Sequence, residues 1–323
     1  MLSVVDPRLH ELAERQGGVL SRRQMLNAGL DYNDVRRMLR RRDLAQVHPG
    51  VYVDHTGPLI WHQRAWAAVL AVWPAALAGE SALRADDGPG RRAASDGPVW
   101  VAVDRKRSIS SPDGVRLVHV VGLAQRVRWN LGPPRMTAED AVLYLAIGAR
   151  SELTAVGVIA DAVQSRRTTA DRMLAALAKR HRVPGRPFLV GVLRDVRDGT
   201  CSVLEHGYLT RVERPHGLPR GRRQSPAESG RRIYRDVEYP EQDAYVELDG
   251  RLFHDTARAR DADLDRDLNA AVGRRVTLRL GWGQVFDRSC LTAAKVARVL
   301  IARGWAAGTL TPCAPGCPVS AEA

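Results

Sequence analysis

The sequence predicts a multidomain protein that combines α+β and α/β architecture. Three short helical segments and a hairpin signal open the chain, and mixed strand and helix signals fill its middle. A strand pair followed by helix, strand and helix closes it. With 323 residues, the chain is long enough for two or three domains, each with its own core. The predicted divisions are residues 1–56, 57–200 and 201–306, with a flexible tail over 307–323.

The charge balance favours a polyanionic partner. The chain carries 49 Lys and Arg against 36 Asp and Glu, a formal net charge of +13 that comes mostly from arginine. Such a charge favours nucleic acid or an anionic membrane surface as the partner. The alternative is that an arginine-rich composition reflects a GC-rich genome. The hydrophobic fraction of 45% is typical of a globular protein and argues against disorder.

The sequence gives no indication of export or of a membrane span. Its first residues lack the basic and apolar regions of a signal peptide. The most apolar segment, residues 59–77, contains His62, Arg64 and Pro74, so we expect a buried helix there. Four cysteines in a chain of this length do not indicate a disulfide scaffold, and the cytoplasm is the expected compartment. These cysteines are Cys201, Cys290, Cys313 and Cys317.

The N-terminal sequence predicts three short helices followed by a hairpin. Ser21 with Gln24 three residues later is a capping box that opens the second helix, and Asp31 caps the third. His48-Pro49-Gly50 is the turn between two short strands. This order of elements predicts a winged helix-turn-helix. The helices are expected over residues 7–16, 21–29 and 31–41, and the strands over 44–47 and 51–53.

The third helix carries a run of arginines. Val35, Met38 and Leu39 recur at helical spacing and are expected to face the core, which leaves the arginines on the outer surface. Guanidinium groups presented by such a helix suit a DNA groove and its phosphates. The alternative is a solvated basic face on a helical interaction module. Because a hairpin follows the helix, we favour binding of double-stranded DNA by Arg36, Arg37, Arg40, Arg41 and Arg42.

Two stretches of this region carry a family resemblance. GGVLSRRQMLNAGL and LAQVHPGVYV, together with the arginine-bearing helix between them, resemble the N-terminal domain of AbiEi-type antitoxins of type IV toxin–antitoxin systems. The likeness covers about the first fifty-five residues. It implies DNA binding and autoregulation, and it leaves open whether a cognate toxin is a partner.

The middle region predicts mixed α and β structure without a chemical motif. Residues 58–85 are expected to form a nearly all-apolar helical stretch, with residues 80–83 as a candidate start of another helix. Its Trp61, Trp66 and Trp73 are expected to pack between domains. Residues 99–103 and 115–121 are expected strands. Further helices are expected over 137–147, 153–164, 169–180 and 186–197.

The stretch RRIYRDVEYPEQDAYVELDGRLFH, residues 231–254, predicts a hairpin with acidic residues at one end. Its strands are expected over 233–237 and 244–248, with Asp236 ending the first. Glu247 and Asp249 are two residues apart and therefore leave the same face of the sheet. Paired strands bring these three carboxylates together. The alternative is that Asp236 and Asp249 are ordinary strand-end and turn residues.

Three adjacent carboxylates need a compensating cation. Each ionised group raises the pKa of the others unless a positive charge neutralises them. Carboxylate oxygens suit a hard divalent ion, so the expected cofactor is Mg²⁺ or Mn²⁺.

The C-terminal motifs resemble the PD-(D/E)XK nuclease fold. ELDGRLFHD, RDADLDRDLNAAV and TLRLGWGQVF are similar to a domain family related to very-short-patch-repair endonucleases. Over residues 201–305, the resemblance makes Asp236 and Glu247 the metal-binding acids. It makes Glu205 the acidic residue of the preceding helix and His254 the histidine after the last motif strand. Asp249 stands where the general pattern has lysine, so the cationic group is not identified; Arg258 is a weak candidate.

The resemblance implies hydrolysis of DNA phosphodiester bonds. Asp236 and Glu247, with Asp249 and the carbonyl of Leu248, are expected to hold the ion that activates water. His254 is expected either to act as a general base or to pack in the core. Glu205 is either an outer ligand or a surface residue.

Two non-catalytic readings compete with the nuclease. One is an antitoxin-like repressor with a degenerate nuclease fold, which the missing lysine favours. The other is an interaction protein whose basic faces bind acidic proteins. In the tail, Cys313 and Cys317 supply half of a zinc site; without an evident second pair, a reduced, disordered tail is expected. The oligomeric state is not determined by the sequence.

Overall fold

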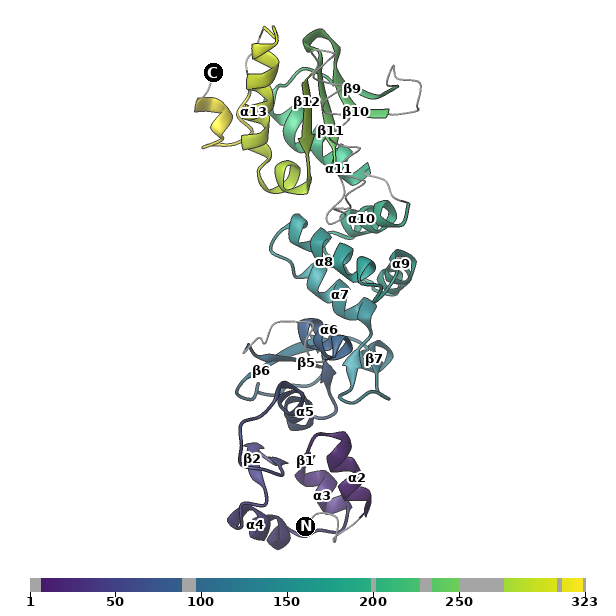
Figure 1. Ribbon diagram of the computed structural model, residues 1–323, viewed down its shortest axis with the longest axis vertical. Coiled ribbons are helices and arrows are strands. Elements are labelled where there is room, and N and C mark those ends of the chain that lie inside the picture. The colour runs from purple at the N-terminus through teal and green to yellow at the C-terminus, as the bar shows by residue number, and fades with distance from the viewer. Residues whose placement is uncertain are drawn as a thin grey trace. The chain divides into compact units, whose positions relative to one another are not determined.

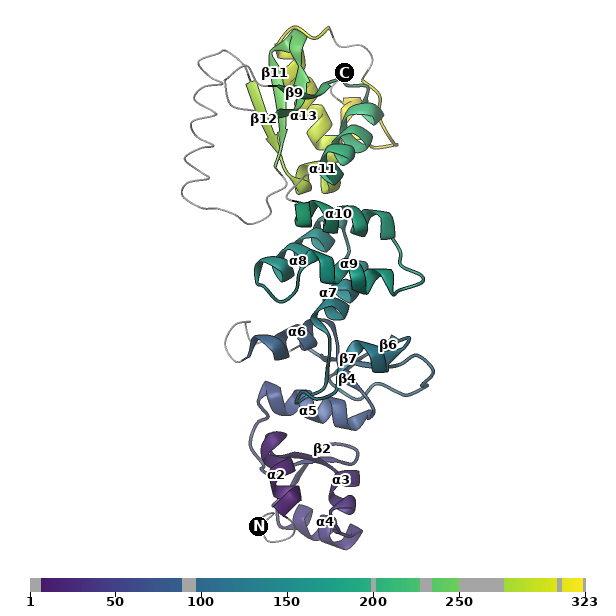
Figure 2. The same cartoon turned by 90° about the vertical axis from the view of Figure 1, so that its right-hand side faces the viewer.

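The computed structural model describes residues 7–88, 97–198, 202–226, 234–249, 276–306 and 310–321. The chain divides into two compact units, Met1–Leu145 and Ala146–Ala323, which are described separately below. Figures 1 and 2 show their elements from two directions. Across the described ranges, no helix combines the length and the apolar character needed to cross a membrane.

The first unit begins with the three helices and the hairpin that the sequence predicts. The expected capping box of Ser21 with Gln24 is present, and the expected cap Asp31 forms a second capping box with Asp34. An unpredicted strand, β1, precedes the second helix and pairs with β3, so the sheet has the antiparallel order β1-β3-β2. The elements are α2 (Pro7–Arg15), β1 (Val19–Ser21), α3 (Arg22–Asn27), α4 (Tyr32–Arg40), β2 (Ala45–His48) and β3 (Val51–Val53).

A small core holds these helices against the sheet. Val35 and Met38 of α4 are buried in one cluster with Met25 of α3 and Tyr52 of β3. The opposite face of the sheet packs on the following helix through Trp66. Helix α4 therefore faces the core with the residues that the sequence predicts. The arginines of its other face are exposed.

The rest of the first unit surrounds a five-stranded sheet of order β6-β5-β4-β8-β7. The two strands expected near residues 99–103 and 115–121 are confirmed as β5 and β6, which pair in parallel. The elements are α5 (Trp61–Ala71), β4 (Ala76–Leu77), α6 (Gly79–Asp87), β5 (Val99–Asp104), β6 (Val115–Val120), η1 (Leu123–Arg126), β7 (Val127–Arg128) and β8 (Arg135–Met136).

The helical stretch expected over residues 58–85 is interrupted by a strand, and the candidate second helix near residues 80–83 is confirmed as α6. The segment forms α5, the short central strand β4 and α6. Pro74 cannot continue the hydrogen bonding of a helix. Gly79, at the start of α6, has φ +45° and stands close to the Trp100 ring, a position where a side chain would collide. Trp66 packs between helix and sheet as expected.

Helices open the second unit, and they appear as a group in both views (Figures 1 and 2). Helix α7 (Ala138–Ile147) spans the division between the units and is opened by Thr137, which accepts a hydrogen bond from the amide of Asp140. The three further helices expected from the sequence are confirmed as α8 (Glu152–Gln164), α9 (Ala170–Ala178) and α10 (Arg186–Asp198).

The C-terminal part of the second unit has a mixed sheet of order β12-β11-β10-β9. The outer pair β11–β12 is parallel and the other pairs are antiparallel. The elements are α11 (Ser202–Gly207), the π-helical turn η2 (Tyr208–Glu213), η3 (Arg214–His216), β9 (Arg222–Pro226), β10 (Tyr234–Tyr239), η4 (Pro240–Gln242), β11 (Ala244–Leu248), β12 (Val276–Leu280), η5 (Gly283–Asp287), α13 (Ser289–Ala302) and η6 (Pro318–Ala321).

Two sequence expectations for this sheet need correction. Asp236 lies inside a strand, because β10 continues to Tyr239, where the aromatic ring is buried. From its charge alone, the arginine-rich stretch of residues 219–232 is a candidate DNA-facing hairpin, but its Arg223 turns inward. Its guanidinium pairs at 2.7 Å with Glu213, whose side chain is almost fully buried. The expected strand over residues 244–248 is confirmed as β11.

A buried polar network joins the helical layer to this sheet. Glu213 Oε2 accepts hydrogen bonds from Arg223 at 2.7 Å and from the Tyr239 hydroxyl at 3.2 Å. The hydroxyls of Tyr208 and Tyr239 lie 3.0 Å apart. Burial raises the pKa of both tyrosines above the ordinary range, so the two hydroxyls stay protonated. Glu213, Tyr208 and Tyr239 therefore each have a hydrogen-bond partner. Within the described residues, Nη1 of Arg223 is buried without one.

Residues 310–321 pack against the second unit, in contrast to the flexible tail expected there. Leu310, Cys317 and Val319 are buried. The amide of Thr311 donates to the carbonyl of His216 at 3.2 Å. The tail therefore returns to the turn that follows η2.

Candidate functional site

The exposed face of α4 is the first candidate site. All five predicted arginines are exposed. Arg36, Arg37 and Arg40 lie on the helix, Arg41 is its C-cap, and Arg42 follows with a left-handed φ of +62°. Arg42 therefore leaves the helical surface that the sequence assigned to it.

One of these arginines is partly neutralised within the helix. Arg37 pairs with Asp34 one turn earlier at 2.5 Å. The pKa of Asp34 is lowered, first by the hydrogen bond from the Asp31 amide and then by Arg37. Because Asp34 is needed for the capping box, Arg37 is the least available of the helical arginines for an external phosphate.

The hairpin after α4 is fixed to α3 by Arg22, the first residue of that helix. Gly50, with φ +75°, makes the turn between β2 and β3, and its carbonyl accepts from the amide of Arg22 at 2.7 Å. The Arg22 side chain also donates to the Tyr52 hydroxyl at 2.7 Å. The hairpin and the two helices α3 and α4 thus form one rigid surface.

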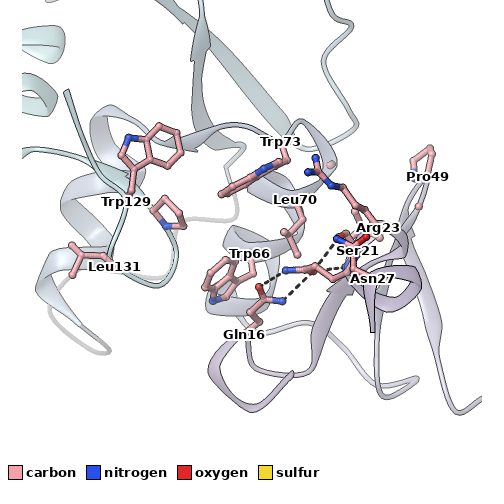
Figure 3. Close-up of a pocket in the computed structure, with 15 residues that line it drawn as sticks. Gln16, Ser21, Arg23, Asn27, Pro49, Trp66, Leu70, Trp73, Trp129 and Leu131 are labelled. Atoms are coloured by element: carbon pink, nitrogen blue, oxygen red, sulfur yellow. Dashed lines mark hydrogen bonds between the residues drawn. The ribbon is translucent and has the colours of Figure 1, made fainter. Parts of the chain in front are cut away.

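A cleft of about 480 Å³ lies on another side of the first unit. Figure 3 shows the rings of Trp66, Trp73 and Trp129 in this cleft, together with polar side chains that include Gln16, Ser21 and Asn27. Trp73 and Trp129 meet edge to face at 6.0 Å and remain 41% and 38% exposed. The expected packing role fits the buried Trp66, whereas Trp73 lines an open cleft that the sequence did not indicate.

The second candidate site is the acidic end of the β10–β11 hairpin. Asp236 is half-buried, and its Oδ2 accepts the amide of Leu248 at 2.6 Å. Burial raises its pKa most, and the neighbouring charges of Glu247 and Asp249 raise it further, against the lowering effect of the Leu248 amide. The three carboxylates that the sequence predicted to converge are therefore electrostatic neighbours.

A cation lies beside this cluster on the neighbouring strand. Arg279 of β12 is the register partner of Glu247 in the parallel β11–β12 pair. Its Nε lies 3.2 Å from Glu247 Oε2. The sequence had no way to pair residues 247 and 279, because the strands that bring them together are separated by a long connection. Strand periodicity over residues 276–280 was the only signal available.

The structure describes two of the remaining predicted site residues, Asp249 and Glu205. Asp249 continues the strand pairing, because its amide donates to the carbonyl of Leu280 at 2.9 Å. Glu205 is half-buried on α11, and the charges that raise the Asp236 pKa come from Glu247 and Asp249. His254 and Arg258 lie outside the described residues.

Comparison with known proteins assigns the N-terminal segment. Residues 7–53 match the family described as "Transcriptional regulator, AbiEi antitoxin". The matched segment begins with α2 and ends with β3, so it coincides with the three helices and the hairpin.

The other comparisons add little. No curated protein matches the chain. Among solved structures, the chain is similar to the RV2827C protein from Mycobacterium tuberculosis, with 19% identity and a TM-score of 0.36 over 64% of this chain and 80% of that one.

Proposed function

We propose that this protein binds double-stranded DNA through the arginines of α4. The observation that carries the proposal is the exposure of Arg36, Arg40 and their neighbours on a helix whose other face is buried. Three helices followed by a hairpin are typical of winged helix-turn-helix domains, which place such a helix in the major groove. The family description of residues 7–53 supports a role in transcriptional regulation. In that context a cognate toxin is a further proposed partner.

The DNA proposal is tested by fluorescence anisotropy with a labelled duplex. The variant Arg36→Gln/Arg40→Gln removes two exposed guanidinium groups and leaves the buried face of α4 unchanged. We expect its affinity to fall on the order of tenfold at physiological salt, because two phosphate contacts are lost. The matched control is Arg15→Gln on α2, an exposed arginine that already pairs with Glu11. Equal affinity of the double variant and this control argues against the proposal.

A second candidate function is metal-dependent cleavage of DNA by the acidic site. The supporting observation is the raised pKa of Asp236 beside Glu247 and Asp249. A half-buried carboxylate in the field of two others is a site that a divalent cation relieves. The oxygen-only donor set suits Mg²⁺ or Mn²⁺. A mixed sheet with a parallel outer pair is compatible with the nuclease fold that the motifs resemble.

The proposed roles follow from the side chains present. Asp236, Glu247 and Asp249 would hold the ion, and Lewis-acid polarisation of the phosphodiester is the chemistry that such an ion supplies. Arg279 pairs with Glu247 and lies where it can stabilise charge on a bound phosphate. It is therefore our candidate for the cation that the family pattern supplies as lysine.

Nicking of supercoiled plasmid tests this second function. The protein is assayed with Mg²⁺ or Mn²⁺, with EDTA and with Glu247→Ala. The matched control is Glu238→Ala, a glutamate on β10 of the same sheet. Cutting that requires the ion and Glu247 but not Glu238 supports the nuclease. Protein that binds DNA without cutting it supports an antitoxin-like repressor with an inactive nuclease fold.

A further inference from the structure

Four side chains of the second unit meet at a point remote in sequence from the acidic motif. His216, Cys290, Cys313 and Cys317 each offer one ligand atom, and these atoms all lie within 4.8 Å of one another. They come from three places: the end of η3, the start of α13 and the C-terminal segment. The sequence indicated only the Cys313–Cys317 half of this group, because the other two ligands are 23 or more residues away.

The imidazole of His216 is buried and oriented as in metal-binding histidines. His216 is fully buried, and its Nδ1 lies 2.9 Å from the carbonyl oxygen of Val212. A carbonyl only accepts, so Nδ1 carries the hydrogen and Nε2 carries the lone pair. Within the described part of the chain, this buried Nε2 has no hydrogen-bond partner. A carbonyl bond of this kind on the other ring nitrogen is what orients metal-binding histidines in proteins.

The sulfur atoms complete a compact donor set. The Sγ atoms of Cys290 and Cys313 are 3.4 Å apart, a contact distance that is too long for a disulfide. Cys313 and Cys317 are separated by three residues, within the spacing typical of zinc ligand pairs. Gly316, with φ +79°, allows the chain to turn between them. Tetrahedral zinc with three thiolates requires sulfur separations of roughly 3.5–4 Å.

We propose that His216, Cys290, Cys313 and Cys317 bind a structural Zn²⁺ ion. Three thiolates and one imidazole are a donor set that selects zinc over the oxygen-preferring ions proposed for the acidic site. Four protein ligands leave no open position, so the ion serves the fold and takes no part in hydrolysis. It ties the C-terminal segment to α13 and to the turn after η2, and the 310–321 segment has few apolar side chains of its own to hold it there.

Metal analysis of the full-length, untagged protein tests the site. The protein is first dialysed against EDTA to remove weakly held ions. We then expect about one zinc ion per chain by inductively coupled plasma mass spectrometry. Cys313→Ser and Cys317→Ser lose that zinc and unfold at lower temperature. Cys201→Ser is the matched control, since it removes a thiol while leaving the four ligands unchanged, and it retains the metal. This readout is independent of DNA binding and of cleavage.

A second measurement uses the unmodified protein in case the serine variants do not fold. X-ray absorption at the zinc edge is expected to show three sulfur neighbours and one nitrogen, at about 2.3 and 2.0 Å. Protein without stoichiometric metal, or with iron in place of zinc, would overturn the proposal. So would a Cys290–Cys313 disulfide in the purified chain, or zinc that persists in both serine variants.

Discussion

Asp236 shows how the acidic site differs from an ordinary strand end. Its carboxylate is half-buried, hydrogen-bonded to the Leu248 amide and placed beside Glu247 and Asp249. Because its folded-state pKa is raised, the folded chain holds the proton more tightly than the unfolded chain does. The ionised carboxylate therefore lowers the stability of the fold at neutral pH. This destabilisation is lost as pH falls through the raised pKa. A residue that weakens the fold in this way is typical of a functional site.

Replacement of this residue should stabilise the protein in the absence of metal. Asp236→Asn removes the buried charge, while its amide oxygen still accepts from Leu248. We expect the melting temperature in EDTA to rise by a few degrees, and stabilisation by Mn²⁺ to be lost. Thermal unfolding with and without Mn²⁺ measures both effects. A lower melting temperature in EDTA, with Mn²⁺ stabilisation intact, contradicts this assignment.

Metal binding at the acidic site should depend on pH. The proton on Asp236 must leave before the carboxylate binds an ion, and burial with the Glu247 and Asp249 charges raises the pKa at which it leaves. Mn²⁺ affinity is therefore expected to weaken as pH falls, beginning above the pH of about 4 at which an ordinary aspartate protonates. Calorimetric titration between pH 8 and about pH 4.5 is the measurement; a flat affinity would count against the site.

At the scale of elements, Glu213 links η2 to the sheet. It accepts hydrogen bonds from Arg223 and Tyr239 and is almost fully buried. Glu213→Ala leaves Arg223 without its carboxylate, so we expect a loss of about 3 kcal/mol in unfolding free energy. Urea denaturation measures it, and Asp198→Ala, which removes an exposed carboxylate paired with Arg197, should hardly move the midpoint. Similar midpoints for both variants would show that the network adds nothing to stability.

Local signals predicted the elements well, and long-range pairing explains what they missed. The capping boxes at Ser21 and Asp31 involve residues three apart, so the sequence alone placed α3 and α4. The apolar stretch of residues 58–85 was expected to be helical, with a candidate second start near residue 80. Its apolar content did not indicate that the strand β4 separates the two helices.

The sequence predicted only the part of the acidic site that is local in the chain. Asp236, Glu247 and Asp249 lie within fourteen residues and were found together. Arg279 is brought to Glu247 only by the parallel β11–β12 pair. His216 and Cys290 are brought to Cys313 and Cys317 only by the returning tail. No local pattern carries that information.

At the scale of the whole molecule, the two proposed functions lie in different units. The arginines of α4 belong to Met1–Leu145, and the acidic site belongs to Ala146–Ala323. Their effects are therefore expected to be separable and additive. Arg36→Gln/Arg40→Gln should keep full stabilisation by Mn²⁺. Glu247→Ala should bind duplex DNA in EDTA as tightly as the unaltered protein or slightly better, since a negative charge is removed. A loss of DNA affinity in Glu247→Ala as large as in the arginine variant would contradict this separation.

The salt dependence of duplex binding tests the central claim most directly. Each phosphate that an arginine neutralises releases counterions and adds about 0.9 to the slope of log Kd against log salt concentration. We predict a steep slope for the unaltered protein, a slope lower by about 1 to 2 for Arg36→Gln/Arg40→Gln, and no change for Arg15→Gln. If the double variant and the unaltered protein give the same slope and the same affinity, α4 is not the surface that binds DNA.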